Sequence, residues 1–129
     1  MLFPFKTGPF ARTTKQSGDT GEALALAYLQ QAGLRLLARN YRTPGRGGGE
    51  IDLIMLEPDG TCVFVEVRQR ACGAHGGAAA SVSVTKQAHL IFAARHFLLR
   101  YASPPPCRFD VVAIDGAKLA WIRAAFDAG

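Results

Sequence analysis

Acidic side chains that could carry chemistry lie in one stretch, GEIDLIMLEPDGTCVFVEVRQR, which runs from position 49 to position 70. Two runs rich in β-forming residues flank Pro58-Asp59-Gly60, and this combination predicts a β-hairpin. A hairpin centred on that turn places Asp52 opposite Glu66. Opposed carboxylates would lie about 5 Å apart at Cβ and would repel each other, so something positive must lie beside them. The residue types and their spacing therefore predict a site for a divalent metal ion.

Alternation along the two strands assigns the side chains of the hairpin to two faces. Asp52, Glu66 and Arg68 share one face. The opposite face is apolar and consists of Leu53, Met55, Val63, Val65 and Val67. The chemical residues are thus expected on one side of the hairpin, with a buried core on the other side.

The rest of the chain supplies the elements that must position this hairpin. The patterns predict a helix at 19–33, strands at 34–42, 51–56 and 61–67, a helix at 83–101, and strands at 107–114 and 118–123. This order predicts an α/β fold with a mixed sheet, the hairpin near its centre and a helix on each side. We expect a mobile arm at 1–17 and a single domain at 18–129.

Glu22 has two interpretations that the sequence leaves open. Asp19 as the N-cap, followed by Glu22, has the spacing of a capping box at the start of the first helix. Glu22 also shares a helical face with Ala25 and Leu29, so its carboxylate would point along the buried stripe. A buried carboxylate needs a partner, and a ligand role at the hairpin would provide one.

The second helix carries a lysine near the hairpin, and two loops flank the central strands. Lys86 precedes Leu90 by one turn, so its amine either reaches inward or lies along the surface. In the strand before the hairpin, Arg35, Leu37, Arg39 and Tyr41 are expected on one face. Arg46 lies at the tip of a Gly-rich connector, where it could touch a phosphate, and residues 71–81 are expected to form a loop that orders on ligand binding.

The charge and the cysteines of the chain bear on its partner and compartment. The net charge is +5, which favours a polyanionic partner. The three cysteines form no CxxC pair, and reduced thiols in a cytosolic protein are the simplest explanation. The chain has no apolar run long enough for a signal peptide or a membrane span. We therefore expect a soluble, cytoplasmic protein.

Five segments in a fixed order give the chain a family resemblance. GEALALAYL, GEIDLI, FVEVRQR, SVSVTKQAHL and RFDVV together resemble the YraN-type family of small bacterial, endonuclease-like proteins. That family is similar to the PD-(D/E)XK nucleases, which include Holliday junction resolvases and restriction enzymes. The resemblance implies a restriction-endonuclease-like three-layer sandwich and a metal-dependent endonuclease that hydrolyses DNA, with branched or structured DNA in repair or recombination as its substrate.

The resemblance also implies roles for individual residues. The catalytic positions would be Asp52, Glu66, Arg68 and Lys86, and Mg²⁺ or Mn²⁺ would be held by Glu22, Asp52 and Glu66. Contacts to nucleic acid would come from Arg42, Arg46, Arg70 and Gln87. A homodimer is the assembly that analogy at the level of fold suggests.

One departure from the superfamily pattern leaves three hypotheses. Arg68 occupies the position of a lysine, and a guanidinium stays protonated, so it can bind phosphate but cannot act as a base. The first hypothesis is a nuclease in which Lys86 supplies the amine. The second is a nuclease-fold module that binds nucleic acid or a DNA-processing partner without cleavage. In the third, the charged residues form only a structural salt-bridge network.

Overall fold

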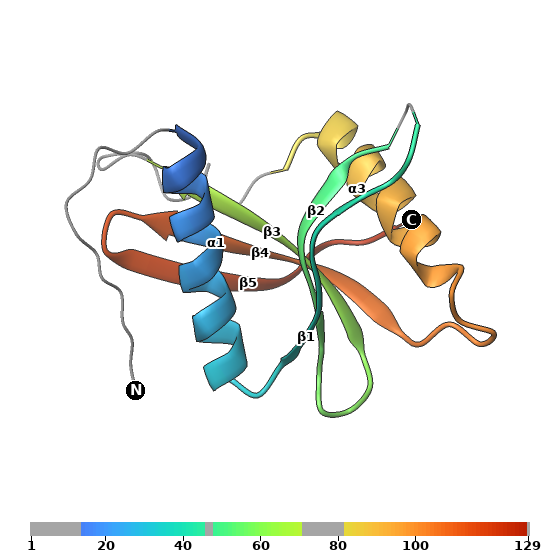
Figure 1. Ribbon diagram of the computed structural model, residues 1–129. Helices are drawn as coiled ribbons and strands as arrows, with labels where there is room; N and C mark the ends of the chain where they lie inside the picture. Colours follow the sequence, from blue (N-terminus) through green and yellow to red (C-terminus); the bar gives the residue numbers. More distant parts are fainter. Residues whose placement is uncertain (1–13, 46–47, 71–81, 129) are drawn as a thin grey trace.

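The structure, a computed structural model, describes residues 14–45, 48–70 and 82–128 (Figure 1). The elements in these ranges are α1 (Thr14–Gln31), β1 (Arg35–Arg42), β2 (Glu50–Leu56), β3 (Cys62–Arg70), α3 (Val84–Leu98), β4 (Cys107–Asp115) and β5 (Lys118–Phe126). The predicted order of helix, three strands, helix and two strands is confirmed for this part of the chain.

The strands form one mixed sheet in the order β1-β2-β3-β4-β5. Neighbours pair antiparallel except β3 and β4, which run parallel through nine paired positions. Parallel neighbours need a crossover connection, and α3 lies in that connection. The hairpin of β2 and β3 therefore lies in the middle of the sheet, as predicted, and its register pairs Ile54 with Phe64 and Leu56 with Cys62.

The two helices pack against alternate side chains of the hairpin, and each contact forms its own buried cluster. Ala25 and Leu29 of α1 pack with the hairpin residues Leu53, Met55, Val63 and Val65. The apolar stripe of α3 packs with the other set, and the members of this second cluster include Ile54, Cys62, Phe64, Leu90, Ala93, Ala94 and Phe97. Because successive side chains of a strand point to opposite faces, α1 and α3 cover opposite faces of β2 and β3.

The start of the first helix differs from the prediction. We expected Asp19 to cap the helix, but α1 begins at Thr14 and Asp19 lies inside it. The capping box is therefore wrong: Glu22 is an interior residue of the helix, two turns from its start. Residues 14–17 of the expected arm belong to α1, and residues 1–13 lie outside the described ranges. A capping pattern marks a possible start, and the helix continues past it because the preceding TKQS sequence tolerates helix.

Irregularities in the edge strands account for two further differences. The pairing of β1 with β2 shifts between Leu36 and Ala38, so the alternation of β1 changes there. Leu37 and Tyr41 pack toward α3, whereas Arg39 reaches α1, so their predicted common face is wrong. The left-handed backbone of Asn40, with φ of 48°, lies between Arg39 and Tyr41 and interrupts the alternation a second time. Strand β5 extends to Phe126, three residues beyond the prediction.

A buried carboxylate accounts for the longer β5. Asp110 of β4 is fully buried and accepts hydrogen bonds from Arg108 Nε at 3.0 Å, from Trp121 Nε1 at 2.8 Å and from the backbone N–H of Ala124 at 2.9 Å. Arg108 also forms an ion pair with Glu57, just before the hairpin turn. These contacts join β4, β5 and the tip of the hairpin, and Asp110 itself pairs with Val65, one residue before Glu66 on β3.

Candidate metal and phosphate site

The hairpin forks at the position where the sequence places its acidic residues. The ladder between β2 and β3 ends at the pair Leu53 and Val65. Beyond this pair, β2 stays with β1 as far as Glu50, while β3 stays with β4 as far as Arg70. Figure 1 shows β2 turning toward α3 and β3 running behind α1 from this point. Asp52 and Glu66 are the first residues past the fork on their two strands.

The side chain of Asp52 takes part in forming the fork. Its Oδ2 accepts a hydrogen bond of 2.8 Å from the backbone N–H of Val67, where a regular hairpin would use a main-chain carbonyl. Asp52 and Glu66 are therefore not a regular ladder pair, and the predicted direct opposition is wrong in this detail. Their proximity is confirmed, because the Glu66 carboxylate contributes to the electrostatic environment of Asp52.

Burial disfavours the charged forms of both acids, and the Glu66 carboxylate adds to this effect at Asp52. Burial, followed by the adjacent Glu66 carboxylate, raises the pKa of Asp52 to about 7, although the Val67 N–H favours the charged form. Burial also raises the pKa of Glu66, against the opposing effects of Lys86 and Arg68. Asp52, which is half-buried, and Glu66, which is buried, are thus two neighbouring carboxyls whose charged forms a bound cation would favour.

Lys86 reaches this pair from the first turn of α3. Its Nζ lies 3.6 Å from Glu66 Oε2, but its side chain is 45% exposed, so the amine reaches the pair from the surface of the molecule. The turn that carries Lys86 is capped by Ser83, whose Oγ accepts a hydrogen bond of 3.1 Å from the Lys86 N–H. The cap and the ion pair together fix the position of the amine relative to Glu66.

Glu22 approaches the site from α1 on the other side. Its side chain is 14% exposed, and its Oε1 accepts a hydrogen bond of 2.9 Å from Asn40 Nδ2. Arg39 Nη2 lies 4.0 Å from the same oxygen. The Glu22 carboxylate also contributes to the raised pKa of Asp52, so the predicted inward orientation is confirmed.

Asn40 was not among the predicted site residues. It has φ of 48°, in the left-handed region, where asparagine is among the few side chains commonly found. The signal available in the sequence was an asparagine within a predicted strand, a place where asparagine is disfavoured.

The remaining predicted positions lie around the fork or outside the described ranges. Arg68 is half-buried and contributes to the electrostatic environment of Glu66. Arg42 is exposed at the edge strand and pairs with Glu50 at 3.1 Å, and Gln87 donates a hydrogen bond of 2.8 Å to the Val82 carbonyl. Arg46 lies outside the described residues, as does the loop at 71–81, and Arg70 ends β3 with a side chain that is not described. Their contacts to nucleic acid stay predictions.

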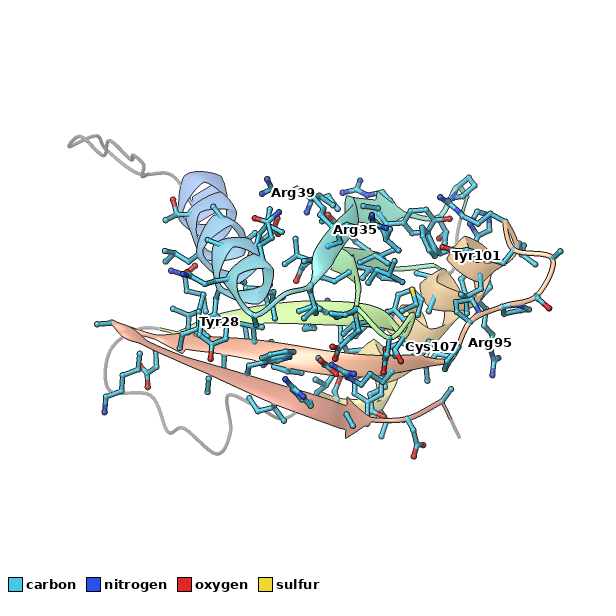
Figure 2. The ribbon with its side chains drawn as sticks, turned by 90° about the horizontal axis from the view of Figure 1, so that it is seen from below. Tyr28, Arg35, Arg39, Arg95, Tyr101 and Cys107 are labelled. Atoms are coloured by element: carbon cyan, nitrogen blue, oxygen red, sulfur yellow. The ribbon has the colours of Figure 1, made fainter. Side chains whose placement is uncertain are left out.

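Several arginines lie along the edge strand β1. Figure 2 shows Arg35 and Arg39 on this edge, on the far side of the sheet from β4 and β5. With Arg42 at the end of the same strand, three arginines follow the edge next to the fork.

The number of carboxylates at the fork is the property of the site that fits a hard divalent cation. In the described ranges, no three His, Cys, Asp or Glu side chains are grouped so as to hold one ion. Mg²⁺ commonly takes one or two carboxylates and completes its shell with water and substrate phosphate. Asp52 and Glu66 match that requirement, while Glu22 as a third ligand stays a prediction.

Fold and site together define a class of protein: a mixed α/β protein in which two neighbouring carboxylates and an amine converge where the sheet forks. The model of the "Uncharacterised protein family UPF0102" matches residues 21–114. The chain therefore belongs to this family, which is the YraN-type group that its five segments resemble.

Relatives in several bacteria support this assignment. The chain is similar to a UPF0102 protein of Albidiferax ferrireducens, with 70% identity over 116 residues that cover 90% of this chain and 91% of the relative. Similar proteins occur in Paracidovorax citrulli, 64% identical with 91% and 87% covered, and in Methylibium petroleiphilum, 64% identical with 90% and 98% covered. Among the described residues, no helix is long and apolar enough to cross a membrane.

Proposed function

We propose that this protein is a nuclease that uses Mg²⁺ or Mn²⁺ to hydrolyse phosphodiester bonds of DNA, with branched or flapped DNA as its substrate. One observation carries the proposal: Asp52 and Glu66 meet at the fork, and Lys86 Nζ lies 3.6 Å from Glu66. The finer fold assignment, a restriction-endonuclease-like three-layer sandwich, belongs to the same proposal, and so does a cytoplasmic location.

Asp52 and Glu66 would hold the cation. When bound, such an ion supplies a Lewis acid for the phosphoryl oxygen and a water of lowered pKa. The fixed Val67 N–H orients Asp52 before any ligand arrives, so the carboxylate needs little rearrangement on binding.

The basic residues would act on the phosphate itself. Arg68 keeps its charge and would stabilise the negative charge that develops on the pentavalent phosphorus. Lys86 is the amine beside Glu66, and we assign to it the proton-handling role that the lysine two positions after the second carboxylate has in the resembling superfamily. The edge of arginines along β1, with Arg46, Arg70 and Gln87, would hold the DNA backbone.

Cleavage assays with a matched pair of variants test the proposal. We expect labelled duplex, flap or four-way junction DNA to be cut in Mn²⁺ or Mg²⁺ and left intact in chelator. Asp52→Asn should lower kcat by about 100-fold or more, since a charged group at the reaction centre is lost. Asp59→Asn makes the same chemical change in the exposed hairpin turn, where an amide oxygen can still accept the Thr61 N–H, and should cut normally. Wild-type protein that cuts none of these substrates with either metal would rule the proposal out.

Arg68 favours a second candidate function, a module that binds nucleic acid without cleaving it. In this case binding alone should be robust, should fall steeply with salt and should not change when metal is added. Measuring affinity for uncut DNA between 50 and 200 mM salt, with and without Ca²⁺, separates the two functions. A dependence of affinity on the metal that Asp52→Asn abolishes would exclude the metal-independent module.

A further inference from the structure

We propose that Asn40 is a positioning residue that holds the Glu22 carboxylate at the fork for the metal and phosphate site. The inference rests on the proposed function and assigns a role to a residue that the superfamily resemblance does not include. Three features of Asn40 support it: its place in the sheet, its hydrogen bond and its backbone conformation.

The register places Asn40 between Glu22 of α1 and Asp52 of β2. Its neighbours on β1 pair with β2 as Arg39 with Leu53 and Tyr41 with Ile51, so Asn40 lies across the strands from Asp52. Its side chain turns toward α1 and donates from Nδ2 to Glu22 Oε1 at 2.9 Å. Asn40 therefore connects the helix that carries Glu22 to the strand position that faces Asp52.

The hydrogen bond counters the repulsion within the site. The charges of Glu66 and Glu22 both act on Asp52, and nothing in the chemistry of these carboxylates would keep Glu22 turned inward. The Asn40 amide and the Arg39 guanidinium both contact Oε1, and only the amide is within hydrogen-bond distance. A neutral donor can hold a carboxylate in place without neutralising the charge that a cation needs.

The backbone of Asn40 raises an alternative, which a substitution can separate. With φ of 48°, Asn40 could be present only because few residues tolerate this conformation. Glycine adopts the same φ without strain but has no amide, so Asn40→Gly keeps the backbone and removes the donor. Ala124 of β5 has φ of 51°, and its N–H binds Asp110, which is not one of the site residues, so Ala124→Gly is the matched control.

The test compares Mn²⁺ affinity by calorimetry, kcat and KM for labelled DNA, and the unfolding temperature. For Asn40→Gly we expect an unfolding temperature near that of the wild type, a loss of about 10- to 100-fold in Mn²⁺ affinity and in kcat, and little change in KM. Ala124→Gly should match the wild type in metal affinity and kcat.

A double variant shows whether Asn40 acts through Glu22. Glu22→Gln removes the charge but keeps an oxygen that can accept the Asn40 amide, so this single variant still tests the role of Glu22 in metal binding if Asn40→Gly proves unstable. If Asn40 works by positioning Glu22, the Asn40→Gly change should add little further loss in the Glu22→Gln background. Losses that multiply, or an Asn40→Gly protein with wild-type affinity and kcat, overturn the inference alone. Wild-type protein with neither Mn²⁺ binding nor cleavage overturns the inference together with the proposed function.

Discussion

At the scale of single residues, Asp52 shows how one side chain can shape the backbone and the chemistry together. It accepts the Val67 N–H and so replaces a main-chain partner at the end of the ladder. The same side chain is half-buried beside Glu66, and its burial, followed by the Glu66 carboxylate, raises its pKa to about 7. A group in this position costs stability while it is ionised and unliganded, which is a common property of functional sites.

This cost gives stability a predictable dependence on pH. The unfolded chain releases the Asp52 proton near the ordinary value of 3.8, and the folded protein releases it near 7. The contribution to folding stability is therefore fully present below about pH 4 and is lost as the pH rises through about 7. Asp52→Asn stays neutral, and its amide oxygen can still accept the Val67 N–H. In metal-free buffer we expect the variant to unfold at a higher temperature than the wild type at pH 8 and at the same temperature at pH 4.

The size of the effect is bounded, and its sign separates two hypotheses. Each pKa unit corresponds to about 1.4 kcal/mol, so Asp52→Asn should raise the free energy of unfolding at pH 8 by at most about 4 kcal/mol. If the charged residues formed only a structural salt-bridge network, neutralising Asp52 would instead leave a cation less well paired and lower stability. Thermal melts at both pH values, with Asp59→Asn as the control, distinguish the two results.

Sequence reasoning identified the individual site residues better than it identified their contacts. Asp52, Glu66 and Lys86 could be found because alternation in a strand and spacing in a helix place a side chain on a face. Asn40 could not be found in this way, because its role depends on a left-handed backbone and on the arrival of α1. The Val67 N–H likewise binds the Asp52 carboxylate instead of a main-chain carbonyl of the ladder. The alternation of side chains along a strand cannot predict such a replacement.

At the scale of elements, the first turn of α3 contains both the N-cap contact of the helix and the lysine of the candidate site. Ser83 Oγ accepts the N–H of Lys86, the residue whose amine meets Glu66. Ser83→Ala should lower the free energy of unfolding by about 1 kcal/mol through loss of the N-cap, or about 3 °C in unfolding temperature for a domain of this size. Fraying of this turn should also lower kcat, because Lys86 loses its fixed position.

A conservative variant provides the control for the N-cap. Ser83→Thr keeps a hydroxyl that caps the helix and should retain both stability and cleavage. Chemical denaturation and the cleavage assay check the two effects side by side. Equal stability of the alanine and threonine variants would show that the cap contributes nothing here.

Element boundaries were predictable where a strong local signal ends an element. The hairpin turn is one example: Thr61 N–H binds Asp59 Oδ1, and Gly60 has φ of 95°, as its sequence suggests. The start of α1 and the register shift near Leu37 were not predictable, since no residue there forbids the alternative. In both cases packing between elements decided what local propensity left open.

At the scale of the whole molecule, the site and the stability of the fold depend on different carboxylates. Asp110 is fully buried and joins Arg108, Trp121 and the Ala124 N–H, which are not among the site residues. Asp110→Ala would leave these donors unpaired and should lower the free energy of unfolding by about 3–5 kcal/mol. Asp115→Ala, at the end of the same strand, should change it by less than about 0.5 kcal/mol. Denaturant titration measures both, and similar losses in the two variants would contradict this division of roles.

The pairing of β2 with β3 ends at Leu53 and Val65. Beyond this pair the sheet consists of two separate ribbons, and each can open without the other. One contains residues 50–52 with β1, and the other contains residues 66–70 with β4. A ligand bound by Asp52 on one ribbon and by Glu66 on the other would link the two ribbons. Its binding free energy would then stabilise both ribbons against opening. Hydrogen exchange should therefore slow in both ribbons together on adding Mn²⁺, and this concerted protection should disappear in Asp52→Asn.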